Sequence, residues 1–172
     1  ILGQVPEEID AVAAPFLDNP LGVLASTNHP LARAKNIPVQ SLSEEAFIMR
    51  EPGSGTRMAT ERFFTDRGLK INIRMELGSN EAIKQAIVGE LGVAVLSRHT
   101  LALDAPMGQL VMLDVEGFPL KRSWYYAYPS GKQLSIVAET FLEYLRQAPD
   151  FLVDLSCYHA SVGCCPLLSK GK

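Results

Sequence analysis

The sequence predicts an α/β fold with a largely parallel sheet, because strand patterns and amphipathic helix patterns alternate along most of the chain. Three observations carry this prediction. Residues 92–96 form a continuous apolar run, typical of a strand covered on both faces. Residues 70–77 alternate between apolar and polar side chains, with the period of a half-buried strand. Ile83, Ile87 and Leu91 recur at helical spacing between these two runs.

The elements before residue 70 follow from apolar runs and helix-end signals. Ser41 is expected to cap a short helical turn, because Glu44 stands three residues later. Gly68 is expected to end a longer helix. In order, the sequence predicts a strand at 21–25, a helical turn at 41–45, a strand at 47–49 and a helix at 56–67.

The second half continues the alternation. Ser79 is a good N-cap for the helix that carries Ile83. Trp124 and Tyr126 belong to an aromatic strand, whose rings suit either ligand stacking or, as the better interpretation, a core strand buried on two sides. After the strand at 92–96, we expect a helix at 99–103, a strand at 110–115, the aromatic strand at 123–128 and a helix at 134–147.

Composition excludes several classes of function. The chain has 172 residues, 47% hydrophobic residues and a net charge of −3, with Lys and Arg scattered. That argues against a nucleic-acid surface in this segment, because phosphate binding needs clustered cations. No apolar run approaches about 18 residues, so no transmembrane helix or membrane partner is predicted.

The C-terminal residues 149–172 are interpreted as a loosely attached tail. They hold the three cysteines, Cys157, Cys164 and Cys165. The odd number is poor material for a disulfide framework, and the adjacent pair lacks zinc-knuckle spacing. Reduced cytosolic thiols are the favoured interpretation, with metal binding or redox sensing as alternatives. The chain does not start with Met, and we expect it to be a fragment of a longer protein.

The loop between the strand at 47–49 and the following helix is the best candidate binding site. It reads Glu51-Pro-Gly-Ser-Gly-Thr56 and is flanked by Arg50 and Arg57. A helix N-terminus offers free N–H groups, and glycines let them approach an anion. Ser54 and Thr56 add hydroxyl donors, Gly55 opens the backbone, and the two arginines offer a fork suited to carboxylate or phosphate. An ordinary turn with a Ser or Thr N-cap is the alternative.

The second candidate is the pair Gly92 and Val93, at the start of the apolar strand. A glycine there would let a backbone group face a ligand, although a plain turn before a buried strand explains it as well. No catalytic set is found, because His29, His99 and His159 share no metal-ligand spacing and no paired nucleophile and base occurs. We therefore expect neither an enzyme nor a resident cofactor or metal.

Four stretches in combination resemble a known family. They are PFLDNPLGVLASTNHPLA, FIMREPGSGTRMATERFF, LGSNEAIKQAIVGELGVAVLSRHTL and YPSGKQLSIVAETFLEYL. Together they resemble the effector-binding domain of LysR-type transcriptional regulators, most of all the regulators of Calvin-cycle, RuBisCO-encoding operons. The resemblance covers about residues 1–148.

The resemblance implies a type 2 periplasmic-binding-protein-like fold, with two Rossmann-like lobes and an effector in the cleft between them. Residues 1–20 would end the first lobe, which would be incomplete. Residues 21–122 would form the second lobe and residues 123–148 would return to the first. The family's ligand contacts match Arg50, Glu51, Ser54, Gly55, Thr56 and Arg57 in the loop, and Gly92 and Val93 at the strand.

The implied function is sensing of a small anionic metabolite by a cytoplasmic regulator of carbon-fixation genes. The implied assembly is a homodimer or tetramer, with DNA bound only through an N-terminal winged helix-turn-helix outside this chain. A transporter's solute-binding protein shares the fold and stays as the alternative. An enzyme built on the same lobes is the third hypothesis, against which the lack of a nucleophile and base weighs.

Overall fold

The computed structural model describes residues 1–3, 10–101 and 108–147. Alternation of strands and helices is present as the sequence predicts. The strands are β1 (Ala11–Asp18), β2 (Leu21–Ser26), β3 (Ala46–Arg50), β4 (Asn72–Leu77), β5 (Ala94–Ser97), β6 (Leu110–Met112) and β7 (Ser123–Pro129). The helices are α1 (Gly55–Thr65), α2 (Asn80–Val88) and α3 (Ile136–Gln147), with short 3-10 turns η1 (Pro30–Arg33), η2 (Val39–Glu44) and η3 (Arg98–Leu101).

The central sheet is largely parallel, as expected, except that β2 runs against the other four strands. β3 and β4 pair in parallel, whereas β2 pairs antiparallel with both β5 and β6. A parallel bridge between Phe47 and Val93 joins the two groups, giving the order β4-β3-β5-β2-β6. The βαβ rule therefore holds from β3 through α1, β4 and α2 to β5. It does not extend to β2, the strand of the central sheet that runs in the opposite direction to the other four.

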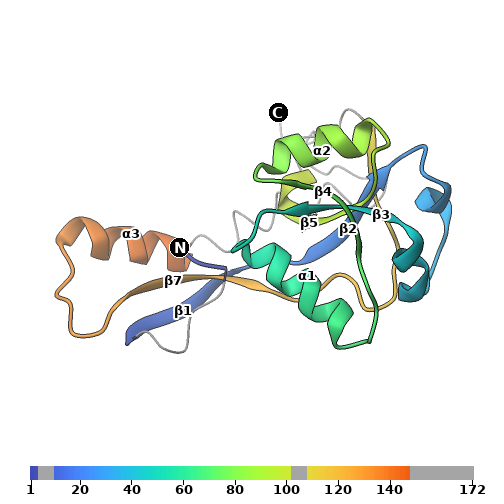
Figure 1. Cartoon of the computed structure of the whole chain (residues 1–172). Coiled ribbons are helices and arrows are strands. Elements are labelled where there is room, and N and C mark those ends of the chain that lie inside the picture. Colours follow the sequence, from blue (N-terminus) through green and yellow to red (C-terminus); the bar gives the residue numbers. More distant parts are fainter. Residues whose placement is uncertain (4–9, 102–107, 148–172) are drawn as a thin grey trace, which may run out of the picture.

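Two helices cover opposite faces of this sheet (Figure 1). On one face, Phe63 and Phe64 of α1 pack against Phe47 and the other members of a buried cluster. The rings of Phe47 and Phe64 meet edge to face, with centroids 5.5 Å apart. On the other face, Ile83 and Ile87 of α2 join a second buried cluster. The helical stripe predicted from Ile83 and Ile87 is thus the buried face of α2.

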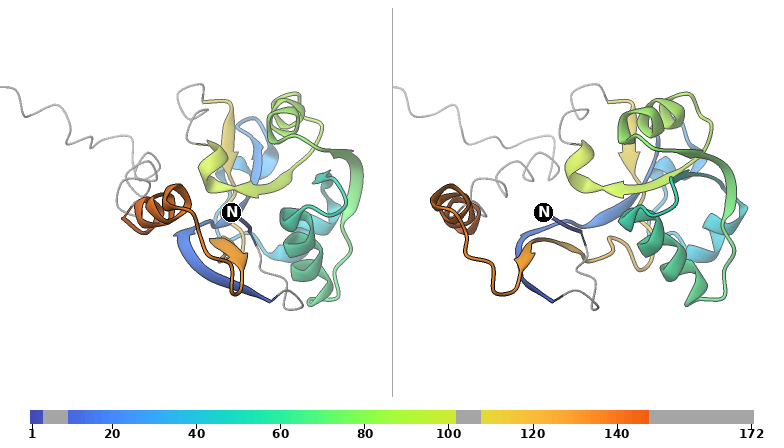
Figure 2. Two further views of the ribbon diagram at one scale, coloured as in Figure 1. Left: turned by 90° about the vertical axis from the view of Figure 1, so that its left-hand side faces the viewer. Right: turned by 60° about the vertical axis from the view of Figure 1, so that its left-hand side comes forward.

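A two-stranded arm extends from the sheet toward α3. β1 and β7 pair antiparallel over most of their length, and α3 follows β7 (Figure 1). Both views of Figure 2 show α3 standing apart from α1 and α2. Of the β7 residues, Tyr126 alone is buried, at 9% exposure, so the expected two-sided burial of this strand is wrong. The reason is that β7 belongs to the arm, and neither of the two buried clusters of the central sheet includes a residue of β7.

Several element boundaries differ from those predicted. Ser41 lies inside η2, whose N-cap is Pro38, and makes no capping bond; the predicted cap is wrong because the turn begins two residues earlier. In the edge strand β4, Ile73 stays 41% exposed, since a register shift in the β3–β4 pairing interrupts the alternation. The predicted helix at 99–103 is η3, and its last two residues lie outside the described range, as does the tail at 149–172.

The chain crosses between the arm and the sheet twice, and the two crossing segments lie side by side. Leu21 and Leu120 exchange backbone hydrogen bonds of 3.0 and 2.8 Å. The Asn19 N–H donates to the Arg122 carbonyl at 2.7 Å. These bonds hold the start of β2 against the segment that leads into β7.

Candidate functional site

The loop at 51–56 lies between a buried strand and a helix N-terminus, as the sequence predicts. β3 ends at Arg50 and α1 begins at Gly55. The Ser54 N–H donates to the Glu51 carbonyl at 3.2 Å, and Gly53 takes a φ of +86°, a conformation that favours glycine. Ser54 is the N-cap residue, yet in the described residues its hydroxyl accepts no capping hydrogen bond. Ser54 therefore holds the N-cap position without the side-chain hydrogen bond that a capped turn usually has.

Arg50 is occupied by a carboxylate of the same loop. Its Nε and one terminal nitrogen donate to the two Glu51 oxygens at 2.7 and 2.8 Å, and its other terminal nitrogen donates to Asn80 Oδ1 at 2.8 Å. The hydrogen bonds from Arg50 lower the pKa of the Glu51 carboxyl below its usual range. The pair with Glu51 is bidentate, and the hydrogen bond to Asn80 joins the end of β3 to the first turn of α2.

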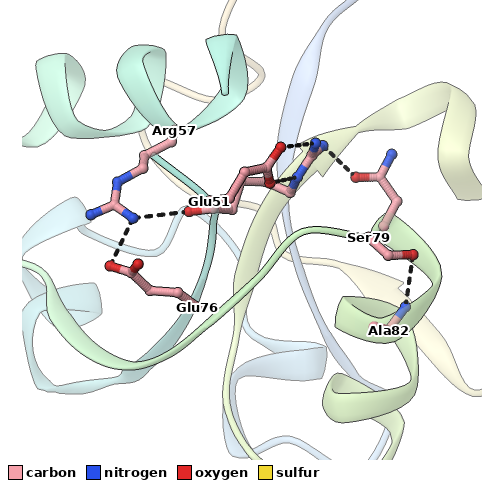
Figure 3. Close-up of polar contacts among 7 residues, drawn as sticks. Glu51, Arg57, Glu76, Ser79 and Ala82 are labelled. Carbon is pink, nitrogen blue, oxygen red and sulfur yellow. Dashed lines mark hydrogen bonds and ion pairs between the residues drawn. The ribbon is translucent and has the colours of Figure 1, made fainter. Parts of the chain in front are cut away.

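Two carboxylates pair with Arg57, and Figure 3 shows one of them, Glu76. Arg57 donates to Glu61 at 2.7 Å and pairs with Glu76 of β4 at 2.7 Å. A third hydrogen bond reaches the Arg50 carbonyl at 3.0 Å. The hydrogen bonds that Arg57 donates to Glu61 and, with a smaller effect, to Glu76 raise the pKa of Arg57. Both arginines of the predicted fork lie at the loop, but in this structure each is already matched by negative charge.

Gly92 and Val93 lie just before β5, where the chain meets β3. The Val93 N–H donates to the Ala46 carbonyl at 2.8 Å, and the Val93 carbonyl accepts from the Ile48 N–H at 2.8 Å. A Cβ on Gly92 would lie 2.2 Å from the Ala46 oxygen. The glycine is therefore required by the close approach of β3, and both backbone groups of Val93 are used within the sheet.

A third arginine reaches the loop from the crossing segment, and the sequence analysis missed it. One terminal nitrogen of Arg122 donates to the Gly3 carbonyl at 2.7 Å and lies 3.1 Å from the position of a Cβ on Gly55. No ion pair joins it to a carboxylate of residues 1–3, 10–101 or 108–147. Burial lowers the pKa of Arg122. In the sequence, Arg122 is recognisable only as the residue before the aromatic strand, and that position gives no reason to place it at the loop.

Two surface hollows lie away from this loop. One is bounded by Gly22, Arg98 and the residues of β6, and the other by Phe16, Tyr126 and Arg146 on the arm. Neither hollow is bounded by residues of the loop at 51–56. Within the described part of the chain, no three His, Cys, Asp or Glu side chains gather as a metal site. No described helix is long and apolar enough to cross a membrane.

Comparison with known proteins places this geometry in a family. Residues 1–150 match the LysR substrate binding domain. The transcriptional activator CmpR of Synechocystis sp. is 55% identical over 144 residues, 84% of this chain and 47% of that protein. The RuBisCO operon transcriptional regulator of Acidithiobacillus ferrooxidans is 51% identical over 148 residues, 86% of this chain and 48% of that protein. The chain thus spans about half the length of these curated relatives.

Solved structures of regulatory domains have the same fold as this chain. The regulatory domain of CcmR from Synechocystis PCC6803, in complex with 2-PG, superposes with a TM-score of 0.83 and 52% identity, covering 86% of this chain and 71% of that one. The effector-binding domain of QuiR, in complex with shikimate, has a TM-score of 0.75 at 18% identity, covering 87% of this chain and 70% of that one, and supports the fold alone. These neighbours have the predicted type 2 periplasmic-binding-protein-like fold. The relatives are transcriptional regulators, so neither the enzyme nor the transporter alternative is favoured, and the chain belongs to the LysR substrate binding domain family.

Proposed function

We propose that this chain is the effector-sensing part of a cytoplasmic LysR-type regulator of carbon-fixation genes. Its effector is a small phosphorylated or carboxylated metabolite, and 2-phosphoglycolate is the first candidate. The observation that supports this most is the loop at 51–56. In this loop Ser54 is the N-cap residue of α1, and its hydroxyl makes no capping hydrogen bond. It occurs in a chain 52% identical to the CcmR domain solved in complex with 2-PG.

The proposed site is built mainly from backbone and hydroxyl donors. Ser54 and Thr56 offer hydroxyls, and Gly55 offers its N–H at the positive end of α1. Arg50, Glu51 and Arg57 hold the loop in place through their ion pairs and stay candidates for direct contact if an effector displaces a carboxylate. Gly92 and Val93 contribute by fixing β5 against β3.

The proposed mechanism uses the two crossing segments as the boundary between lobes. Residues 1–20 and 123–148 belong to one lobe and residues 21–122 to the other. An effector that binds the closed cleft better than the open one shifts the population toward closure. In the full-length homodimer or tetramer, this closure re-spaces the DNA-binding heads, which are winged helix-turn-helix domains outside this chain.

A thermal-shift screen tests this function. The 172-residue chain is mixed with 2-phosphoglycolate, sugar phosphates, phosphoenolpyruvate, 2-oxoglutarate or NADPH. A ligand that binds the folded state raises the unfolding midpoint. At a concentration a hundredfold above Kd, it stabilises the folded state by about 2.7 kcal/mol. Ser54→Ala should remove most of the shift, because a hydrogen bond to a charged group contributes about 1.5–3 kcal/mol.

The matched control is Ser130→Ala, on the exposed turn after β7. It should leave the shift unchanged. No shift with any ligand would contradict sensing by this chain. A shift that survives Ser54→Ala undiminished would place the effector somewhere other than the loop.

A further inference from the structure

Arg122 occupies a slot between two glycines from distant parts of the chain. Gly3 precedes β1 and Gly55 begins α1. A Cβ on Gly3 would lie 3.0 Å from a terminal nitrogen of Arg122, and a Cβ on Gly55 would lie 3.1 Å from the same nitrogen. Both contacts are tighter than ordinary van der Waals packing, so the guanidinium fits there because both residues lack side chains.

The position of Arg122 links the two sides of the molecule. Its guanidinium donates to the Gly3 carbonyl, while its own carbonyl accepts from Asn19 in the other crossing segment. Leu2, beside Gly3, exchanges two 2.8 Å backbone hydrogen bonds with Tyr125 of β7. Through one side chain, residues 1–3 are therefore held against the start of α1.

The charge of Arg122 distinguishes it from the other arginines at the loop. Arg50 and Arg57 each face a carboxylate at 2.7 Å, so their charges are balanced inside the protein. Arg122 forms no ion pair with a described carboxylate, although burial has removed part of its hydration. A partly desolvated cation beside the amino end of a helix creates a local positive potential, which an anion would relieve.

We propose, resting on the function proposed above, that Arg122 is the specificity-determining cation of the site. It binds the anionic group of the effector at the loop while holding residues 1–3 against α1. A planar guanidinium with several donors can bond the Gly3 carbonyl and an effector oxygen together. The effector then strengthens a contact that joins the two lobe segments, which favours the closed arrangement.

The test compares Arg122→Gln, Arg122→Lys and wild-type chains by titration calorimetry with 2-phosphoglycolate and, separately, with glycolate. Arg122→Gln should weaken 2-phosphoglycolate binding about ten- to hundredfold, as expected for a lost charged hydrogen bond. It should also flatten the dependence of affinity on salt. Arg122→Lys keeps the charge and should restore part of the affinity. Arg62→Gln, at an exposed arginine of α1, is the matched control and should bind as wild type.

The outcomes separate the inference from the proposed function. If the wild type binds and Arg122→Gln binds equally well with the same salt dependence, the inference is wrong and the function stands. If the wild type binds neither these two compounds nor any other anion of the thermal-shift screen, the function itself fails. Should Arg122→Gln fail to fold by circular dichroism, Gly3→Ala decides, because its Cβ would push the guanidinium out of the slot. Wild-type affinity in both Gly3→Ala and Arg122→Lys would overturn the inference.

Discussion

Gly92→Ala is the sharpest test of how the sheet is joined behind the candidate site. Gly92 has a φ of +152°, which side chains rarely adopt. Its missing Cβ leaves room for the Ala46 carbonyl, which would lie 2.2 Å from the added methyl carbon. Real Cβ contacts under 3.0 Å essentially never occur, so the backbone of β3 or β5 has to move.

The expected cost follows from two contributions. A side chain in a backbone region reserved for glycine costs on the order of 1–3 kcal/mol. Moving the strands apart also strains the hydrogen bonds that Val93 makes with Ala46 and Ile48, each contributing about 1 kcal/mol. We therefore expect Gly92→Ala to lower the free energy of unfolding by about 3–5 kcal/mol.

Urea unfolding followed by circular dichroism measures this cost. Gly68→Ala is the matched control, because Gly68 also has a positive φ, +65°, but its Cβ would have nothing within 4 Å. The control should cost only about 1–2 kcal/mol, the strain of a left-handed residue. If Gly92→Ala costs no more than Gly68→Ala, the close approach of β3 is not what requires a glycine there.

Three further predictions concern packing and charge. Phe64→Ala should lower the free energy of unfolding by about 3–5 kcal/mol, since Phe64 is 1% exposed, whereas Phe141→Ala on exposed α3 should cost about 0.5 kcal/mol or less in the same urea assay. Glu51 has a depressed pKa in the folded state, so its contribution to stability is present above its unfolded pKa and disappears as pH falls through the folded pKa. NMR titration of the Glu51 carboxyl should show the low pKa, and Arg50→Gln should return it toward the usual range; an unchanged pKa would contradict the pairing. Arg57→Gln leaves two facing carboxylates without a cation, so its thermal unfolding midpoint should fall, and more at low than at high salt.

Local signals in the sequence were sufficient for most elements of the sheet. The helix after Ser79 is confirmed with its cap, whose hydroxyl accepts from the Ala82 N–H at 3.5 Å (Figure 3). β1 was not predicted, because its side chains do not alternate and Pro15 interrupts its apolar run. What forms β1 is pairing with β7, more than a hundred residues later, and such a partner leaves no trace in local periodicity.

The candidate site, like the fold, was predictable only where its residues are neighbours in sequence. The strand–loop–helix around Ser54 was predictable, because glycines, a capping residue and flanking apolar runs are neighbours in sequence. The pairing of Arg57 with Glu76 was not, since β4 reaches Arg57 only through the fold. Arg122 lies still further from the loop in sequence, and its approach to Gly55 depends on how the crossing segments are held.

Calorimetric titration of the 172-residue chain with 2-phosphoglycolate tests whether the chain senses an anionic effector. We expect saturable binding at one site per chain, with glycolate binding much more weakly because it lacks the phosphate. Ser54→Ala should weaken the binding, while Ser130→Ala should not. Absence of heat and of any shift in unfolding midpoint with 2-phosphoglycolate and with the other anions would contradict effector sensing through this loop.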